Sequence, residues 1–433
     1  MNAIVLLLSA AILSPIHEVA PVPCDTEEMA IEVARSFRPP ETSRWVTKLG
    51  KAWEGKQARS ERFRRPWSWR LRKTAIRFAA VAADFKVTVN GRATGESKGA
   101  HGVVEFDITD ALKWFGENVV EIRTGDPLGG NQTVFRRVLL VSTSRKSPKL
   151  LKAETTINAD YSAAAFRILD DKGVELKRRD VPSPQFWSDE MPTICMTPIE
   201  TKYGWWKFGG IEYRALMFGL VRSEIRDGEL FLNGKKMNLR VAKKGEYTPG
   251  AKGRSTSASG LAQDIYSLKY MNFNAVLARD MPKICQFYDF CDRDGLMVLA
   301  GRDDDVPPGH ACVIPLDGLK FESVEVPRGK KLVEDLRNAQ SQVKISRIRR
   351  GAVKIDNGMN FLDLEKFDGW VCVDSNGKDA ITGEEPEVKK ISCPPGGTVR
   401  LDLSAYAKGG FTLQLLRDED VVVSKTFGAA ASK

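Results

Sequence analysis

The chain has 433 residues, of which 42% are hydrophobic and 28% charged, and a formal net charge of +10. This length predicts about three domains at roughly 150 residues each, and no low-complexity block points to long disorder. The basic residues are dispersed, with local clusters at 60–73 and 346–354. Dispersed charge is typical of a solvated surface, so we expect no nucleic-acid partner. An alternative role for the positive charge is weak attraction to an acidic polysaccharide.

The few cysteines and histidines argue against metal and redox chemistry. The seven cysteines form no CxxC pair, and Cys285 and Cys291 lie six residues apart on an expected helix. That spacing is about 9 Å along a helix axis, too long for a disulfide. Three scattered histidines disfavour a zinc site and Ser-His-Asp catalysis. We therefore expect no metal site and no cofactor.

The N-terminus carries an apolar run over residues 3–13. Eleven residues are too few to cross a bilayer but suit the core of a signal peptide, which we place at 1–22. This predicts a secreted or periplasmic protein. A buried N-terminal strand or an uncleaved anchor is the alternative. No later segment reaches 18 apolar residues, so we expect no membrane span in the mature chain.

Short β-rich runs dominate the first half of the chain. Runs between residues 66 and 143 are separated by turn residues, among them Asn90-Gly91, a hairpin signal. A second β-rich unit follows at 149–225. Strands at such spacing predict two β-sandwiches.

The pattern changes at residue 226. A hairpin with Asn233-Gly234 at its tip precedes a βαβαβ pattern that ends at Gly301. Its two helices carry apolar stripes at helical spacing: Leu261, Ile265, Leu268 and Met271, then Ile284, Phe287, Tyr288 and Cys291. Pro282 suits the first turn of the second helix and Gly295 its end. The sequence predicts a turn-rich loop over residues 302–318 and a third sandwich over the residues that follow.

Several motifs together resemble glycoside hydrolase family 2, and most closely its β-galactosidases. They include "FKVTVNGRATGESKGAHGVVEFDITDALKWFGENVVEIR", "FWSDEMP", "FGLVRSEIRDGELFLNGKKMNLR", "DIYSLKYMNFNAV", "FYDFCDRDGLMVL" and "AVKIDNGMNFLDLEKFDGWVCVDSNGK". The resemblance implies a mostly β multidomain fold: jelly-roll and immunoglobulin-like β-sandwiches around a truncated (β/α) barrel remnant, plus a C-terminal β-sandwich. The expected domains are a signal peptide (1–22), a jelly-roll sugar-binding-like domain (23–148), an immunoglobulin-like sandwich (149–225), a truncated TIM-barrel remnant (226–318) and a C-terminal sandwich (319–433).

The resemblance also implies a retaining glycosidase mechanism, which needs two carboxylates about 5–5.5 Å apart. In the family both glutamates come from barrel strands beyond the third. A stretch of about 95 residues is far shorter than a complete barrel of roughly 250, so no residue inherits either catalytic role.

The surviving strand ends keep little of the family pattern. Glu246 matches in "VAKKGEYTP", whereas Asp280 takes a histidine position and Ala300-Gly301 replaces an acidic pair. Asp126 aligns loosely with a sugar-contacting aspartate. We name Asp126, Glu246 and Asp280 as candidate substrate contacts, with Glu246 and Asp280 the alternative acid/base pair.

Two further motifs are ambiguous. "RDDD" at 302–305 could bind a cation through its oxygens, but a solvated acidic loop is favoured. Trp187, Trp205 and Trp206 could stack on sugars, but packing within a sandwich is favoured.

Three functional hypotheses remain. The first is a catalytically inactive, carbohydrate-associated relative of family 2, so enzyme activity is uncertain. The second is an active glycosidase on β-linked sugars with a site rebuilt from Glu246, Asp280 or Asp303–Asp305. The third is a structural or interaction module. In it a partner chain, such as a second copy of this chain, or the C-terminal sandwich covers the open barrel edge.

Overall fold

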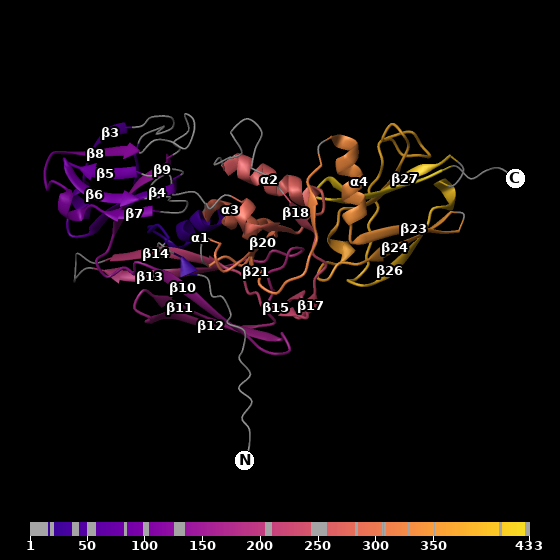
Figure 1. The fold of residues 1–433 in the computed structure, drawn as a ribbon, viewed down its shortest axis with the longest axis horizontal. Coiled ribbons are helices and arrows are strands. Elements are labelled where there is room, and N and C mark those ends of the chain that lie inside the picture. Colours follow the sequence, from indigo (N-terminus) through magenta and orange to yellow (C-terminus); the bar gives the residue numbers. More distant parts are fainter. Residues whose placement is uncertain are drawn as a thin grey trace, which may run out of the picture.

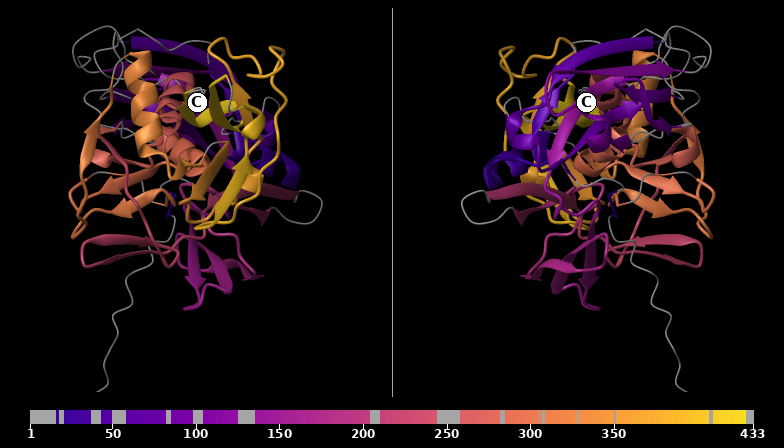
Figure 2. Two further views of the ribbon diagram at one scale, coloured as in Figure 1. Left: turned by 90° about the vertical axis from the view of Figure 1, so that its right-hand side faces the viewer. Right: turned by 90° about the vertical axis from the view of Figure 1, so that its left-hand side faces the viewer.

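The computed structural model describes residues 16–17, 21–36, 43–49, 58–81, 85–97, 104–124, 135–203, 210–243, 258–281, 285–304, 306, 309–327, 329–349, 351–406 and 409–428. Four β-rich and α/β units make up these residues (Figure 1). A jelly roll and a C-terminal sandwich flank a central α/β unit, and a middle sandwich lies below it. Two side views show the middle sandwich projecting from the other units (Figure 2). Among the described helices, none has the length and apolar character needed to cross a membrane.

The jelly roll consists of two four-stranded sheets, in the orders β2-β9-β4-β7 and β3-β8-β5-β6. Their alternating apolar residues meet in one core that includes Phe78, Phe85 and Trp69. Asn90 and Gly91 both have positive φ, 53° and 79°, as the predicted hairpin requires. The strands are β2 (Val46–Lys48), β3 (Ala58–Arg64), β4 (Lys73–Val81), β5 (Phe85–Val89), β6 (Arg92–Ser97), β7 (Val104–Asp107), β8 (Glu117–Thr124) and β9 (Phe135–Thr143).

The middle sandwich packs the sheet β1-β10-β11-β12 against the pair β13-β14. Helix α1 (Glu27–Ser36) contacts β13 and β14. The strands are β1 (Ile16–His17), β10 (Leu151–Ile157), β11 (Ala163–Asp170), β12 (Glu175–Pro182), β13 (Cys195–Tyr203) and β14 (Gly210–Phe218). Strand β1 belongs to the stretch predicted as a signal peptide; residues 1–15 lie outside the described part, and the signal peptide stays a prediction.

A small three-stranded sheet leads into the central unit. It consists of β15 (Ser223–Arg226), β16 (Glu229–Leu232) and β17 (Lys235–Lys236), with Asn233 and Gly234 at positive φ in the predicted turn. The predicted helices follow as α2 (Ala258–Tyr270) and α3 (Cys285–Asp294). The apolar stripe of α2 is buried, and Gly295 ends α3 with a φ of 73°.

The central sheet has five parallel strands in the order β21-β20-β19-β18-β22. They are β18 (Val241–Lys243), β19 (Ala275–Leu277), β20 (Met297–Ala300), β21 (Val313–Pro315) and β22 (Ser323–Glu325), and α4 (Lys330–Gln340) follows. In a barrel the last strand pairs with the first, and β22 occupies that place beside β18. The described strands therefore form part of a barrel, open between β21 and β22.

The central unit is longer than the sequence analysis expects. The turn-rich loop predicted at 302–318 contains β21, and the stretch assigned to the third sandwich contributes β22 and α4. Both strands have only three residues, and all three residues of β22 are exposed. Strands this short show no hydrophobic alternation that the sequence could reveal. They form because they pair with strands already in the sheet.

The C-terminal sandwich packs the sheet β23-β24-β26 against β25-β27-β28. The strands are β23 (Val343–Arg349), β24 (Ala352–Asn357), β25 (Gly369–Val373), β26 (Thr398–Asp402), β27 (Phe411–Arg417) and β28 (Asp420–Phe427). The predicted fold class, a mostly β multidomain chain with a barrel remnant, is confirmed.

The six cysteines whose side chains are described are all free thiols.

Candidate functional site

A pocket of about 360 Å³ opens at the carboxyl ends of β19, β20 and β21, where barrel enzymes place their active sites. Leucines form its apolar wall, and two arginines and three aspartates supply its polar groups. It is lined by Leu277, Arg279, Leu299, Gly301, Arg302, Asp303, Asp304, Leu316 and Asp317. The pocket can therefore receive a small polar ligand.

Two of the three aspartates have structural contacts. The Oδ2 of Asp304 accepts the backbone N–H of Gly301 at 2.8 Å, which closes the turn after β20. The Oδ2 of Asp317 lies 2.7 Å from the Nε of Arg302, in a pair whose side chains are 51% and 89% exposed. An ion pair this exposed stabilises the fold by at most about 1 kcal/mol.

The structure brings together only part of the predicted site. Asp280 lies in the 3₁₀ turn η4 (Ala278–Asp280) after β19 and is half-buried, and its neighbour Arg279 lines the pocket. Asp126, Glu246 and Asp305 lie outside the described residues. The Nζ of Lys243, at the end of β18, lies 3.3 Å from the Oε1 of Glu325 on β22.

Sequence reasoning missed the contribution of Asp317. It follows β21, which the sequence does not reveal as a strand. No periodicity could identify Asp317, and only the parallel pairing of β21 with β20 brings it to the strand ends.

The pocket does not resemble a metal centre. Arg279 and Arg302 share it with the three aspartates, so cationic groups already balance much of the negative charge that would attract a cation. Nowhere in the described part of the chain do three or more His, Cys, Asp or Glu side chains gather in an arrangement that could hold a metal ion.

Trp187 is a packing residue, as favoured from the sequence. Its side chain is fully buried, and its Nε1 donates to the carbonyl of Asp292 at 2.7 Å. The Nδ2 of Asn233 donates to the carbonyl of Trp187 at 2.8 Å. The ring therefore joins the middle sandwich to the central unit and is not available to stack on a sugar. Trp205 and Trp206 lie outside the described residues.

The next residues of the same motif continue this joint. The Oδ2 of Asp189 accepts the Nδ2 of Asn274 at 2.9 Å. The buried ammonium of Lys269 donates to the carbonyls of Asp189 and Gly295 at 2.7 and 2.9 Å. Burial lowers the pKa of Lys269 to about 8, although Asp189 opposes the shift. The motif thus positions α2 and the end of α3.

Glu190 extends the joint to the C-terminal sandwich. Its carboxylate accepts the backbone N–H groups of Asn360, Phe361 and Leu362 at 2.6–3.2 Å and the Nε2 of Gln342 at 2.8 Å. These donors satisfy the hydrogen-bonding capacity of the buried carboxylate. "WSDE" is therefore an interdomain connector.

A second titratable cluster lies behind the central sheet. The Nδ1 of His310 is 2.8 Å from the Oδ2 of Asp292, whose Oδ1 accepts the N–H of Cys312 at 2.7 Å. Burial raises the pKa of Asp289 to about 6, and His310 opposes the shift. The side chain of His310 is only 6% exposed and does not line the pocket, so this cluster fixes the loop before β21.

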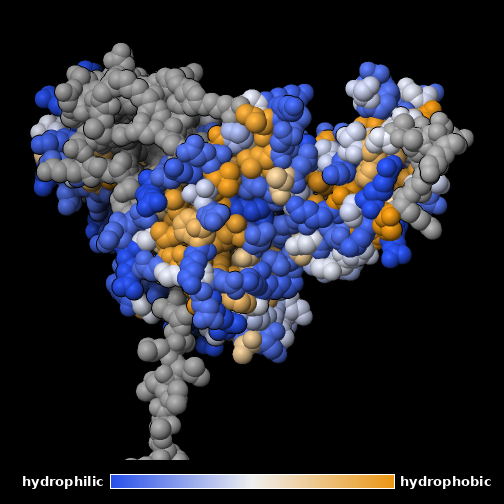
Figure 3. All heavy atoms as spheres, turned by 45° about the vertical axis from the view of Figure 1, so that its right-hand side comes forward, coloured by the Kyte–Doolittle hydropathy of each residue, from blue (hydrophilic) through white to orange (hydrophobic). Residues whose placement is uncertain are grey.

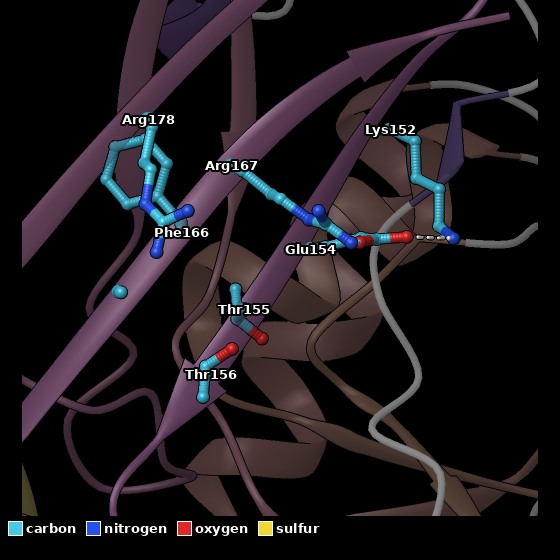
Figure 4. A pocket seen from close by; sticks show the side chains of 8 residues that line it. Lys152, Glu154, Thr155, Thr156, Phe166, Arg167 and Arg178 are labelled. Atoms are coloured by element: carbon cyan, nitrogen blue, oxygen red, sulfur yellow. Dashed lines mark hydrogen bonds and ion pairs between the residues drawn. The ribbon is translucent and has the colours of Figure 1, made fainter. Parts of the chain in front are cut away.

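A further pocket, of about 400 Å³, lies on the sheet β10–β12 (Figure 4). The Nζ of Lys152 and the Nε of Arg167 donate to the carboxylate of Glu154 at 2.6 and 2.7 Å. The close view shows both basic side chains directed at Glu154. Their hydrogen bonds lower the pKa of Glu154, the bond from Lys152 most. Arg178 pairs in register with Arg167 and also lines this hollow. The hollow is an ion-paired sheet surface with no catalytic arrangement.

The fold and the pocket at the ends of β19, β20 and β21 together define a class of protein. It is a multidomain β-sandwich protein with a parallel α/β unit, and its pocket lies where a barrel enzyme has its active site. Residues 223–311 match the family model described as glycosyl hydrolases family 2, TIM barrel domain. The predicted resemblance is confirmed, and the chain is a relative of glycosyl hydrolases family 2.

Curated relatives support this relationship. A β-galactosidase of Staphylococcus xylosus is 24% identical over 316 residues, which cover 63% of this chain and 30% of that enzyme. A β-galactosidase of Klebsiella pneumoniae (strain 342) is 29% identical over 197 residues, covering 44% and 18%. The matches thus span less than a third of the length of these enzymes.

Solved structures to which the chain is similar include β-glucuronidases. The enzyme from Ruminococcus gnavus, in complex with uronic isofagomine, has a TM-score of 0.49 and 16% identity, over 62% of this chain and 60% of that one. The enzyme from Dictyoglomus thermophilum has a TM-score of 0.48 and 16% identity, over 62% and 59%.

Proposed function

We propose that this protein is a catalytically inactive, carbohydrate-associated relative of the family 2 glycosidases, lacking the acid/base and nucleophile glutamates. The observation that carries the proposal is the order of the central sheet. After β21 the next parallel strand, β22, pairs on the far side of β18. The described strands thus include no counterparts of those between the fourth and the last. Strand β21, in the place of the fourth, is followed by Leu316 and Asp317 and not by a glutamate.

The chemistry of the pocket supports the proposal. Retaining hydrolysis requires one carboxylate free to attack and a second that can hold a proton, about 5–5.5 Å apart. Asp304 is committed to the turn after β20, and Asp317 pairs with Arg302. Neither contact leaves its carboxylate free to serve as the nucleophile.

The test is hydrolysis of aryl β-galactosides and aryl β-glucuronides by the purified full chain, together with binding of the corresponding sugars. We expect no turnover above that of the protein-free control. Turnover that Asp317→Asn or Glu246→Gln abolishes would overturn the proposal.

The three aspartates around the pocket favour a second candidate, an active glycosidase with a rebuilt site. Asp303, Asp304 and Asp317 come from two different loops and line one hollow. The same assay separates the candidates, because a rebuilt site predicts turnover that depends on one of these carboxylates. Asp171→Asn, on an exposed turn of the middle sandwich, is the matched control.

The surface of the central unit is relevant to whether the chain binds a second copy of itself. Hydrophobic residues reach the surface over the middle of the molecule (Figure 3). We propose that a second copy of the chain covers this open region, as the sequence analysis suggests. Light scattering after size exclusion tests this, and a stable monomer at micromolar concentration argues against it.

We also propose a secreted or periplasmic location. The buried Arg214 donates through its Nε to the carbonyl of Pro21 at 2.9 Å. Cleavage after residue 22 would remove this acceptor and also strand β1, which pairs with β10. We therefore expect a processing site before Ile16. Mass spectrometry of the exported protein tests this, and an N-terminus after residue 22 would contradict it.

A further inference from the structure

Four large hydrophobic side chains are exposed together at one end of the jelly roll. They form what we call the aromatic platform: Trp67, Leu71, Trp114 and Phe115, which are 72%, 79%, 56% and 73% exposed. Among the described residues, only one other large aromatic side chain, Tyr266, is comparably exposed. Large exposed apolar groups that cluster in this way mark binding surfaces.

Strand pairing brings the platform together from two segments. Strand β3 ends at Arg64, which pairs with Glu117 at the start of β8. The 3₁₀ turn η1 (Trp67–Trp69) follows the end of β3, and Trp114 and Phe115 lie before β8, separated from it by Gly116. The rings of Trp67 and Phe115 are 6.3 Å apart between centroids.

An arginine lies within the platform. The guanidinium of Arg70 is 3.2 Å from the ring centroid of Trp67 and 4.3 Å from that of Phe115. Its Nη2 also donates to the carbonyl of Trp114 at 2.8 Å. A positive charge is thus held beside two exposed aromatic faces.

The backbone beneath the platform is well held. The Nη2 of Arg65 donates to the carbonyls of Trp69, Arg70 and Arg72 at 2.8, 3.3 and 3.1 Å. Trp69 is buried and donates its Nε1 to the carbonyl of Arg44. Because the turn is already ordered, a ligand would bind with little cost in conformational entropy.

Most of the charged groups around the platform are arginines. Burial first, and then the charges of Arg70 and Arg145, lower the pKa of the Arg65 guanidinium. The nearby carboxylate of Glu117 pairs with Arg62 at 3.6 Å, in an exposed contact that solvent screens. The net positive charge favours an anionic ligand.

We propose that the aromatic platform binds an acidic polysaccharide, with sugar rings against Trp67 and Trp114 and the anionic groups near Arg70. A pyranose with a carboxylate or sulfate carries an apolar C–H face and a negative edge side by side. That pattern matches aromatic rings with a guanidinium between them. The inference takes its ligand class from the proposed carbohydrate association, but it concerns a surface separate from the pocket of the central unit.

The test is calorimetric titration of the full chain with polygalacturonate, dextran sulfate, neutral dextran and phosphatidylglycerol vesicles. We expect binding to one or both anionic polysaccharides, weakened by added salt, and none to dextran. The double variant Trp67→Ala/Trp114→Ala should bind at least tenfold more weakly. Ile381→Ala, which alters an exposed apolar residue of the C-terminal sandwich, should bind within twofold of the unmodified chain.

Several outcomes would overturn the inference: equal binding to dextran, binding to vesicles only, no binding to any polysaccharide, or an unchanged affinity in the double variant. If the double variant unfolds at a lower temperature, Phe115→Ala serves in its place, with a loss of at least threefold expected. Failure here leaves the hydrolysis assay unaffected, and turnover of aryl glycosides would not remove binding at the platform. The two proposals therefore fail separately.

Discussion

Replacing Glu212 with glutamine tests how the jelly roll is attached to the middle sandwich. Glu212 lies in β14 and is fully buried. Its carboxylate pairs with Arg72 from the jelly roll and with Arg214 of its own strand, the latter at 2.9 Å. It also accepts the hydroxyl of Ser147 and, at 3.1 Å, the N–H of Ser144. One carboxylate therefore neutralises two buried arginines.

The expected loss of stability is large. Glutamine keeps the size of the side chain but leaves two buried guanidinium groups without a counter-charge. Removing one partner of a buried ion pair costs about 3–5 kcal/mol, and we expect a destabilisation in this range. Retained hydrogen bonds to Ser147 and Ser144 place the value toward the lower end.

The same network predicts a pH dependence. Burial raises the pKa of Glu212, but Arg214, Ser147 and Arg72 together lower it below the usual value of 4.5. Because the folded pKa is below the unfolded one, this stabilisation is fully present above pH 4.5. It is lost as the pH falls through the folded pKa.

Urea denaturation followed by tryptophan fluorescence measures both effects. Because unfolding of several domains need not be two-state, the midpoint of the transition that involves the jelly roll is the quantity compared. Glu200→Gln is the matched control, since Glu200 is 54% exposed and should change stability by no more than about 0.5 kcal/mol. A midpoint for Glu212→Gln equal to that of the control would refute the reasoning.

Three further predictions concern the joint around "WSDE". Because burial lowers the pKa of Lys269 to about 8 from 10.5, the unfolded chain binds more protons between these values. Unfolding free energy should therefore rise with pH from about 8 to 10.5, and a similar rise in Lys269→Met would contradict this. Trp187→Phe removes the hydrogen-bond donor to the carbonyl of Asp292 and should lower the free energy of unfolding by about 1–3 kcal/mol. The control Trp114→Phe, at an exposed site, should change it little. Equal thermal midpoints for the two variants would count against the connector role of Trp187. Gly295→Ala places a Cβ 2.6 Å from the carbonyl oxygen of Asp189, whereas Gly173, at a similar positive φ, has open space. Alanine at 295 should lower the melting temperature more than alanine at 173, and equal shifts would show that the backbone yields.

The sequence by itself determined the local structure of this protein. The turns at Asn90-Gly91 and Asn233-Gly234 follow from residues that tolerate positive φ. The stripes of α2 and α3 follow from helical spacing, and the sandwiches from short β-rich runs. Each of these signals lies within a few residues of the structure it specifies, so the local sequence is enough to predict that structure.

Only the tertiary structure decided the extent of the central sheet and the composition of its pocket. Strands β21 and β22 are specified by pairing with β20 and β18, and their own residues have no strand pattern. The pocket joins Arg279 to Asp317 because parallel strands end at one edge. Likewise, "WSDE" is recognisable as a motif, but its contacts reach Asp292, Lys269 and Phe361, far along the chain. Such contacts depend on how separate elements pack, which no local pattern encodes.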